Sequence, residues 1–419
     1  MKTVRTAQST ILAAVTVFKS ESVKCTESLG RILAEDVLSN RNHPPYDISA
    51  MDGYAVIYDD IDGATKESPA VLKIIDDIKA GDAPKVTLTT GTASRIMTGA
   101  PIPEGADTVI RVEDTDCNET DAKILIPSKK GSNIRLLGEN LRTDDLVLTK
   151  GTDIGPAELG ILAMVKKALV EVYRRPRVAI LSSGDELEGL DDPFDERKIP
   201  DANTYTVMAE MQAIGIEPVL LGIARDNPGE LKDKLKEGLE CDALIVSGGV
   251  SVGHHDFVRP TLKELGVEID FWRVALRPGH PFAFGRRAEG NKLIFALPGN
   301  PVSSMVCAEE FIIPAMRKMM GAVNLFRKTI TVRLGEDVKD KVGRTHFMRS
   351  HLSVNESGEQ TLKLTGSQGS GILMSMVTAD ALLVMPAECS ELKAGTLVTA
   401  QLLNLNGPGA FQEEPGIKE

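Results

Sequence analysis

Cysteine is scarce in this sequence, and its spacing argues against the common cysteine-based metal sites. The chain has five cysteines among 419 residues, and no two of them form a Cys-x-x-Cys pair. Structural zinc and iron–sulfur centres use such closely spaced thiols. We therefore expect neither kind of centre, and we predict free, buried thiols. The cysteines are Cys25, Cys117, Cys241, Cys307 and Cys389.

Clustered basic residues and long apolar runs are also missing. The formal net charge is −12, and no stripe of Lys and Arg is present that would bind a phosphate backbone. No apolar stretch approaches the ~18 residues that a membrane span needs, and residues 1–10 lack the apolar core of a signal peptide. We expect a cytoplasmic protein that binds neither nucleic acid nor membranes.

Apolar residues make up 42% of the chain, which is enough for several hydrophobic cores. The pattern changes character near residue 176. Before it, helical patterns at 1–20 and 156–166 flank short strand-like runs at 70–136 that are broken by Gly and Pro. We expect these two helices to pack together. After residue 176, strands and helices alternate, and from residue 328 onward the pattern is all-β.

This organisation predicts an α/β multidomain protein whose central domain holds a mostly parallel sheet. We predict a discontinuous, mixed N-terminal domain, a β-rich insert, the central α/β domain, a C-terminal β domain and a tail. The boundaries are 1–48 with 137–175, 49–136, 176–327, 328–408 and 409–419.

Three Gly-rich turns in the central region each follow a continuous apolar run. Such runs are typical of parallel strands that are buried on both faces and joined by helical crossovers. In open α/β sheets, ligands bind at the carboxyl ends of the strands, so we expect the three turns to lie together there. The runs are 178–181, 243–246 and 293–297, and the turns are 182–187, 247–253 and 297–301.

The residues of these turns suit phosphate binding. Glycine has no Cβ, so backbone N–H groups beside it can approach phosphate oxygens closely. Gly248, Gly249 and Ser251 are suited to a pyrophosphate, although they could also form only a tight turn. The string 298–301 begins a predicted helix at 302–320, whose positive N-terminus would point into the same pocket, unless it is an ordinary helix start.

Three acids follow strand ends in this region: Glu186, Asp226 and Asp256. Carboxylates at successive strand ends converge in space, and hard oxygen ligands of this kind suit Mg²⁺ bridged to phosphates. An isolated Asp at such a place can equally cap a helix. We interpret Asp185 as structural support for its turn.

Several uncommon strings occur together in one order, and they resemble the molybdopterin molybdenumtransferase family, the bacterial relatives of the gephyrin E domain. Besides the central turns, these strings are 50–54, 96–101 and 366–370. The resemblance runs over nearly the whole chain. It implies an elongated homodimer of four-domain subunits that inserts molybdate into adenylylated molybdopterin and releases AMP with the help of a divalent cation, expected to be Mg²⁺.

The resemblance also implies roles for individual residues. Asp52 and Thr98 of one subunit would approach the central pocket of the other subunit. Arg349 and Ser370 resemble further cleft-lining positions, although a surface Arg is often only a solvated charge. The predicted metal ligands are Glu186, Asp226 and Asp256. The predicted catalytic residues are Asp52, Thr98, Glu186, Asp226, Asp256 and Arg277. The predicted residues for binding adenylyl-molybdopterin are Ser183, Gly184, Gly248, Gly249, Ser251, Gly253, Pro298, Gly299, Asn300, Pro301, Arg349 and Ser370.

The sequence departs from the family pattern at three places. Many bacterial members have Lys-Pro-Gly-Lys where this chain reads Arg277-Pro278-Gly279-His280. Arg keeps its charge and can grip a tetrahedral oxyanion, whereas a histidine with a pKa near ~6.5 is mostly neutral at pH 7. Asn140 replaces a usual aspartate, and His254-His255 stands where an acidic residue is common.

Two other functions share part of this pattern. A molybdopterin adenylyltransferase has a similar central domain and is also the expected pathway partner, but the extra domains here argue against that activity. A non-catalytic scaffold could keep the fold, but the intact set of acids argues against it. Molybdate and tungstate have nearly the same size and charge, so both fit the predicted chemistry.

Overall fold

The structure is a computed structural model, and it describes residues 1–118, 120–248, 257–355, 357–403 and 410–417. The chain forms two compact units. The larger unit contains Met1–Glu35 and Lys150–Glu419, and the smaller contains Asp36–Thr149.

The larger unit is built on a six-stranded sheet in the order β15-β12-β16-β20-β19-β17. Its first four strands are parallel, while β19 is antiparallel to both of its neighbours. The parallel pairing of β12, β16 and β20 confirms the prediction for the three apolar runs. The strands are β12 (Val178–Ser183), β15 (Val219–Ala224), β16 (Ala243–Ser247), β17 (Glu268–Trp272), β19 (Ala283–Arg287) and β20 (Lys292–Leu297).

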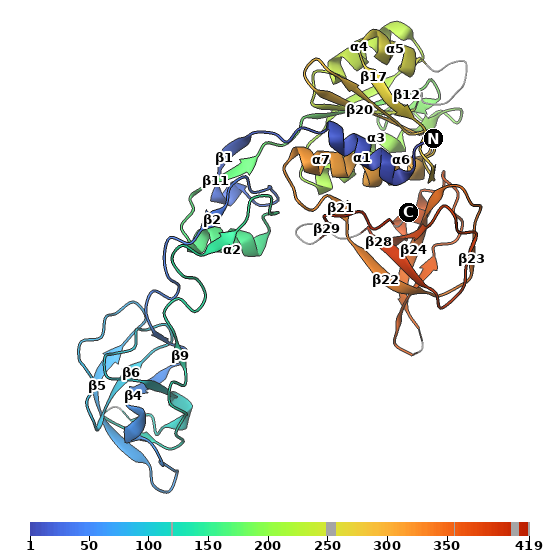
Figure 1. Cartoon of the computed structure of the whole chain (residues 1–419). Helices are drawn as coiled ribbons and strands as arrows, with labels where there is room; N and C mark the ends of the chain where they lie inside the picture. Colours follow the sequence, from blue (N-terminus) through green and yellow to red (C-terminus); the bar gives the residue numbers. More distant parts are fainter. Residues whose placement is uncertain (119, 249–256, 356, 404–409, 418–419) are drawn as a thin grey trace. The chain divides into compact units, whose positions relative to one another are not determined.

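Helices cover both faces of this sheet, as Figure 1 shows, with α4 and α5 on one face and α1, α3, α6 and α7 on the other. Alternate strand residues enter the two cores: Ala179 and Leu181 pack with α4 and α5, while Val178 and Ile180 pack with the opposite layer. Both faces are therefore buried, which explains why the strands are apolar throughout. The helices are α1 (Val4–Ala14), α3 (Ala202–Ala213), α4 (Pro228–Gly238), α5 (Val258–Glu264), α6 (Pro301–Cys307) and α7 (Ile313–Met319).

Two expectations about helices need correction. The helix expected at 1–20 ends at Ala14, and its apolar residues Val4, Ala7 and Ile11 join the core of the central sheet instead of packing on α2 (Pro156–Met164). These three residues are spaced at i, i+3 and i+7, so they lie on one face of α1. This face contacts α7 and the π-helical segment that precedes α7. The helix expected at 302–320 is interrupted by a π-helical segment, η4 (Ala308–Ile312), between α6 and α7.

The C-terminal domain is a closed β barrel. Its strands pair in the order β24-β25-β22-β28-β26, and β26 pairs back onto β24, which closes the sheet. A short strand from the central domain, β18 (Leu276–Arg277), adds to β24 in parallel. The segment around Arg277 is thereby anchored to the barrel. The barrel strands are β22 (Thr329–Leu334), β24 (Thr345–Val354), β25 (Gln360–Leu364), β26 (Ala381–Met385) and β28 (Leu397–Leu402).

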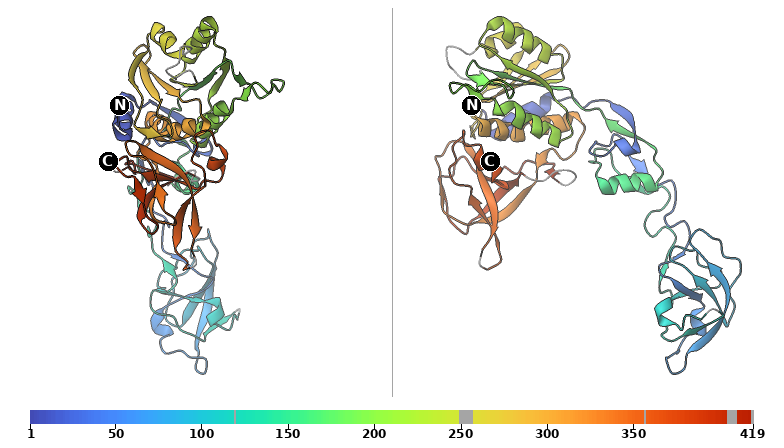
Figure 2. Two further views of the ribbon diagram at one scale, coloured as in Figure 1. Left: turned by 90° about the vertical axis from the view of Figure 1, so that its right-hand side faces the viewer. Right: turned by 180° about the vertical axis from the view of Figure 1, so that it is seen from behind.

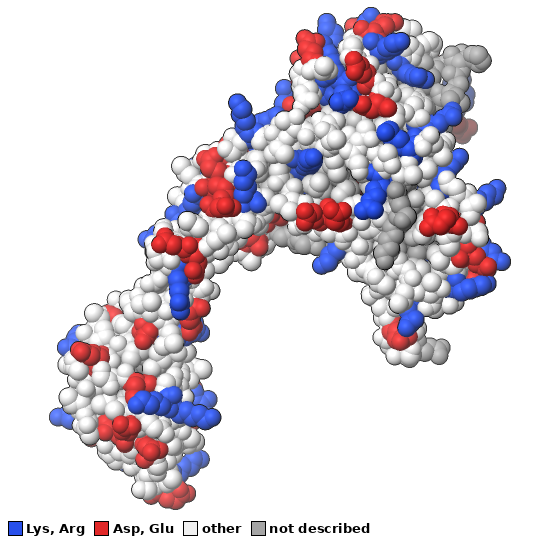
Figure 3. Space-filling model, in the orientation of Figure 1, with Lys and Arg blue, Asp and Glu red and all other residues white. Residues whose placement is uncertain are grey.

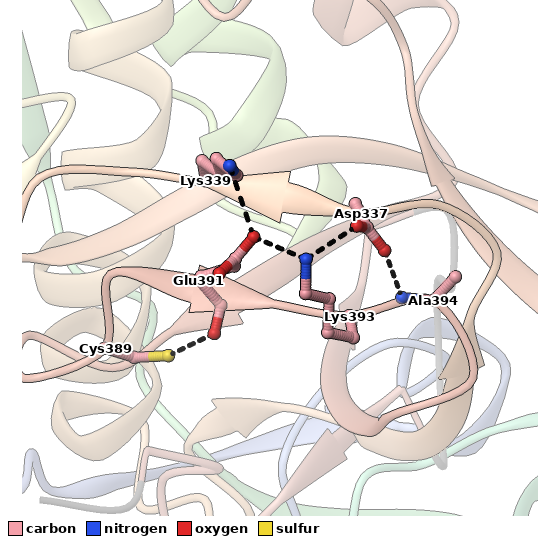
Figure 4. Close-up of polar contacts among 6 residues, drawn as sticks. All are labelled: Asp337, Lys339, Cys389, Glu391, Lys393 and Ala394. Carbon is pink, nitrogen blue, oxygen red and sulfur yellow. Dashed lines mark hydrogen bonds and ion pairs between the residues drawn. The ribbon is translucent and has the colours of Figure 1, made fainter.

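A small ion network lies beside this barrel, where β23 (Val338–Lys339) pairs with β27 (Glu391–Leu392) (Figure 4). The Lys393 ammonium lies 3.0 Å from an Asp337 oxygen and 2.7 Å from a Glu391 oxygen. Because these side chains are exposed to solvent, the pairs contribute little to stability. They hold the ends of the two short strands together.

The smaller unit is a five-stranded sheet in the order β7-β4-β6-β5-β8. Gly53 begins β4, and a Cβ at this position would lie 1.8 Å from the carbonyl oxygen of Ile110 on β7. Only glycine fits so close an approach. The strands are β4 (Gly53–Val56), β5 (Ala70–Ile78), β6 (Thr92–Ile96), β7 (Thr108–Arg111) and β8 (Asp121–Ile124).

The surface and the thiols can be compared with the predictions from composition. On the face drawn in Figure 3, basic and acidic side chains are interspersed over the described surface. Among the described residues, the helices are too short or too polar to span a bilayer. Cys241 and Cys307 are buried as predicted, but Cys117 is exposed. Figure 2 shows the same ribbon from two other sides.

Candidate functional site

The three Gly-rich turns leave the central sheet at the same level. Ser182, Ser247 and Leu297 are cross-strand partners at the carboxyl ends of β12, β16 and β20. Gly248 has a φ of +85°, and a Cβ there would lie 2.3 Å from the carbonyl oxygen of Ser183. Its N–H donates to the carbonyl oxygen of Leu297 at 3.3 Å. The structure therefore brings the three strand ends together, and it requires glycine at position 248.

Asn203, near the start of α3, links two of these turns. Its side-chain amide donates to the Ser247 hydroxyl oxygen at 2.7 Å and to the Gly299 carbonyl oxygen at 2.8 Å. The preceding Asp201 caps α3 by accepting from the N–H of Thr204. The sequence analysis missed Asn203. The Asp-Ala-Asn string at a helix start was the available signal, because such residues satisfy backbone groups at turns.

A cavity of about 390 Å³ opens beside the turn that follows β20. It brings together residues that the sequence analysis had singled out, among them Arg277, His280, Pro298, Asn300 and Ser370. It also contains Ser303 and Arg344, which were not predicted, and Gln368, which lies in the string 366–370 but was given no role of its own. The wall is formed jointly by the central domain and the barrel, since 276–303 come from the first and 344–370 from the second. The predicted Pro301 is the first residue of α6, directly behind this wall.

Arg277 is held in this cavity by a residue that the sequence analysis did not identify. Its guanidinium forms a very short ion pair with Asp340, whose other oxygen lies 2.5 Å from Nδ1 of His346. Although burial opposes it, hydrogen bonds from the Lys341 backbone and His346 keep the pKa of Asp340 below its usual value. Burial lowers the pKa of His346 to about 4. Asp340 is therefore ionised and His346 neutral near pH 7, so Asp340 orients Arg277 without a competing charge.

His280 lies half-buried in the same cavity. Its Nδ1 is 2.9 Å from the carbonyl oxygen of Val274, a contact that the neutral ring can make only if Nδ1 carries the proton. The other ring nitrogen, Nε2, then carries a lone pair and cannot donate to an oxyanion. Protonation of the ring would convert Nε2 into a charged donor.

Arg349 lies behind the cavity rather than in its wall. The side chain is fully buried, and its guanidinium donates to Ser375 Oγ at 3.1 Å and to the Gly369 carbonyl oxygen at 3.2 Å. Burial and the nearby Arg277 lower its pKa to about 10, so it stays charged at neutral pH. Gln368 binds the backbone N–H and C=O of the same residue. Arg349 thus supports the loop that presents Ser370.

Exposed carboxylates gather at the ends of β12 and β15. The N–H of Asp226 donates to Asp185 Oδ1 at 3.0 Å, which confirms Asp185 as a support for its turn. Arg225 clamps the same turn by donating to the Leu187 carbonyl oxygen at 2.6 Å. Glu186 is exposed nearby, and a Cβ on Gly184 would clash with its carboxylate at 2.5 Å. The arrangement leaves Glu186 and Asp226 accessible at one sheet edge.

Part of the predicted site lies outside the described residues. Gly249, Ser251, Gly253, His254, His255 and Asp256 fall in 249–256. Within the described ranges, no group of three or more His, Cys, Asp or Glu side chains is arranged to hold a metal ion. The predicted ligand set includes Asp256, so this observation does not cover the complete set.

In the smaller unit, the structure brings Asp52 and Thr98 together. The Asp52 carboxylate accepts from the Thr98 N–H at 2.7 Å and from its hydroxyl at 2.9 Å. These hydrogen bonds lower the pKa of Asp52, so the exposed carboxylate stays ionised. A separate cavity of about 560 Å³ is lined by Asn140 and by residues that were not predicted, including His43, Arg135 and Glu139.

Three family models match the chain in order. The MoeA N-terminal region (domain I and II) matches residues 2–165, the probable molybdopterin binding domain matches 179–318, and the MoeA C-terminal region (domain IV) matches 331–403.

Similar proteins extend over almost the full length. A molybdopterin molybdenumtransferase from Nostoc sp. is 37% identical over 88% of this chain and 85% of its own, and one from Haemophilus influenzae is 35% identical over 92% and 94%. The crystal structure of a molybdopterin biosynthesis MoeA protein from Pyrococcus horikoshii has a TM-score of 0.81 and 29% identity, covering 96% of this chain and all of that one. The chain therefore belongs to the MoeA family of molybdopterin molybdenumtransferases.

Proposed function

We propose that the chain inserts molybdate into adenylylated molybdopterin with release of AMP, in a Mg²⁺-dependent reaction. The main support is that three strand-end turns converge next to a cavity that contains Arg277. The close approach of two of these strands requires glycine at position 248. The family models on both sides of the central domain favour this transfer over the adenylyltransferase alternative. An adenylyl-transfer reaction must supply the substrate, so a molybdopterin adenylyltransferase is the proposed pathway partner.

The turns supply the proposed binding site for the pyrophosphate of the substrate. Backbone N–H groups of Gly299 and Asn300, with those of the predicted Gly249, Ser251 and Gly253, would contact its oxygens, because glycine has no Cβ to block the approach. Ser183, Gly184 and Ser370 complete the proposed wall. Positioning and charge neutralisation can supply much of the catalysis, so we assign no covalent nucleophile.

The acids at the strand ends fit a magnesium ion through their chemistry. Glu186 and Asp226 present accessible carboxylates, and hard oxygen donors of this kind bind Mg²⁺ together with substrate phosphates. With Asp256, they would hold the ion. When bound, Mg²⁺ supplies charge neutralisation at the phosphates as AMP leaves.

The test of the proposed function is incubation of the purified chain with adenylyl-molybdopterin, Mg²⁺ and molybdate. We expect stoichiometric AMP release and formation of a cofactor that activates an apo-molybdoenzyme. Substrate binding without AMP release would indicate the scaffold alternative. Formation of adenylyl-molybdopterin from ATP and molybdopterin would indicate the adenylyltransferase.

We further propose that Arg277 holds the incoming oxyanion and that a permanent positive charge at position 280 would assist it. His280 lines the same cavity as Arg277, so His280→Lys would place an ammonium group beside the oxyanion. Because a cation beside a dianion in a partly dry cleft is worth on the order of 1–3 kcal/mol, molybdate affinity should rise by about tenfold to a hundredfold in this variant.

Molybdate saturation of the cofactor-forming reaction at pH 8 checks this prediction. His280→Lys should bind molybdate more tightly than the wild type, because lysine is charged at this pH. Equal molybdate affinities of the two proteins would remove position 280 from the oxyanion site.

The family resemblance supports a homodimer in which Asp52 and Thr98 of one subunit act at the central pocket of the other. An Asp52→Ala protein and an Asp256→Ala protein should each be inactive. After subunit exchange, about half of the dimers are mixed and each has one intact site, so about a quarter of wild-type activity should return. Steady-state AMP release after mixing measures this recovery.

The control is a mixture of Asp226→Ala and Asp256→Ala proteins. Both changes lie in the central domain, so every site in a mixed dimer keeps one defect and no activity should return. Absence of recovery in demonstrably mixed Asp52→Ala and Asp256→Ala dimers would refute the shared site.

A further inference from the structure

A second cavity lies away from the strand-end turns, between the helical layer of the central domain and the barrel. It measures about 360 Å³, which is within the size range of sites for small ligands. One stripe of α3 forms its first wall. Met305 of α6 and Glu309 of η4 form the second, and Arg327, Met376 and Leu403 close it. The α3 residues are Thr206, Ala209, Glu210 and Ala213.

Glu210 is the unusual member of this wall. The side chain is 7% exposed, and neither carboxylate oxygen has a hydrogen-bond partner among the described residues. It occupies the inward face of α3 together with Val207 and Met211, where an apolar residue would be expected. A buried carboxylate without partners is costly, so such a group calls for an explanation.

The neighbouring charges neutralise Glu210 only in part. Arg327 of β21 (Phe326–Arg327) is engaged with Glu309, at 2.8 Å from Nε to Oε2 and 3.0 Å from Nη2 to Oε1. Both residues are almost completely buried, and the bidentate pair already balances the charge of Arg327. An ionised Glu210 would therefore leave the cavity with one net negative charge.

The walls of the cavity indicate which counter-charge would fit. Ala209, Ala213, Met305, Met376 and Leu403 offer apolar contacts to a hydrocarbon chain. An inorganic cation needs several oxygen ligands, whereas the described residues contain no cluster of three or more ligating side chains, and the oxygens of Glu309 already bind Arg327. A primary ammonium group on a short apolar chain would satisfy both the carboxylate and the walls.

We propose that this cavity is a binding site for a small organic ammonium ion, whose charged head pairs with Glu210 and whose chain contacts the Met305 and Met376 side chains. The site is separate from the proposed reaction site. It adds a ligand class to the protein that the molybdenum-transfer chemistry does not require.

Proton release should accompany this binding. Burial, followed by the charge of Glu309, raises the pKa of Glu210, while Arg327 opposes the rise. The other titratable groups near it are Cys307 and Glu310, and burial raises the pKa of both. Below its raised pKa, Glu210 must lose a proton before it can pair with an ammonium ion. The apparent affinity should therefore increase by up to about tenfold per pH unit.

The probe is n-hexylammonium chloride, with n-hexanol as a neutral control of the same length, titrated by calorimetry between pH 6 and pH 8.5. An alkylammonium ion remains charged over this interval. We expect saturable binding of n-hexylammonium that tightens with pH and releases protons, and at least about tenfold weaker binding of n-hexanol. Glu210→Gln should lose at least about tenfold in affinity, whereas Glu237→Gln, which removes an exposed acid on α4, should not.

A second variant keeps the proposal testable if the amide distorts the site. Glu210→Met matches the apolar surroundings and should fold well, yet it should bind n-hexylammonium no better than n-hexanol. Equal binding of the two probes to the wild type, or equal affinity in the wild type and Glu210→Met, would overturn the proposal. So would the absence of binding, or displacement of n-hexylammonium by K⁺ or Mg²⁺ at the same site.

Discussion

Replacing Asp226 or Asp256 with alanine is expected to lower Mg²⁺-dependent AMP release by at least about a hundredfold while leaving the protein folded. A bound cation stabilises developing charge by several kcal/mol, and about 2.7 kcal/mol corresponds to a hundredfold in rate. Asp226 is exposed, and its backbone N–H, which alanine retains, donates to Asp185 Oδ1. The loss should therefore appear in turnover and not in packing.

The measurement is AMP release at increasing Mg²⁺ concentration, together with binding of adenylyl-molybdopterin in the absence of metal. Binding should change much less than turnover. Asp233→Ala removes an exposed acid from α4 and controls for the change in net charge. Wild-type rates with normal Mg²⁺ dependence in both variants would show that these acids do not hold the metal.

Arg327→Met is expected to destabilise the folded protein by about 3–5 kcal/mol. Arg327 and Glu309 are both almost completely buried, so the substitution leaves one carboxylate without its partner beside a second unpaired carboxylate, that of Glu210. It also removes the guanidinium that lies 4.8 Å from the Phe411 ring. The cost comes mainly from the stranded charge, because burying an ion without a partner is far less favourable than burying the pair.

Denaturant unfolding followed by the fluorescence of Trp272 measures this effect, since the chain has one tryptophan and it lies in the central sheet. Arg286→Met is the matched control: it breaks a bidentate pair with Asp270 in which the arginine is about half exposed, and it should cost about 1 kcal/mol or less. The triple change Arg327→Met, Glu309→Met and Glu210→Met should recover most of the loss. Equal losses in Arg327→Met and Arg286→Met would contradict the assigned role of burial.

The sequence was sufficient for the parallel strands and for the turns that follow them. An apolar run such as Val178–Leu181 can be satisfied only by burial on both faces, and Gly248 permits a backbone approach that no other residue allows. The predicted position of residues 182–187 and 297–301 at one sheet edge is therefore confirmed by the strand register. The family strings then led to Asp52 and Thr98, which the structure brings into direct contact.

Features that depend on contacts between distant segments could not be predicted in this way. Closure of the barrel requires β26 to pair with β24, and the position of Arg277 depends on Asp340, sixty-three residues away. Arg349 is buried by the distant loop that holds Gly369 and Ser375, and Glu210 by the packing of α3 on α6 and η4. Neither residue carries a local signal of burial. Local sequence patterns predict the secondary structure of a segment and which of its faces is exposed to solvent. The surroundings of a polar side chain are set instead by which distant surface covers it, and this is decided only when the domains pack.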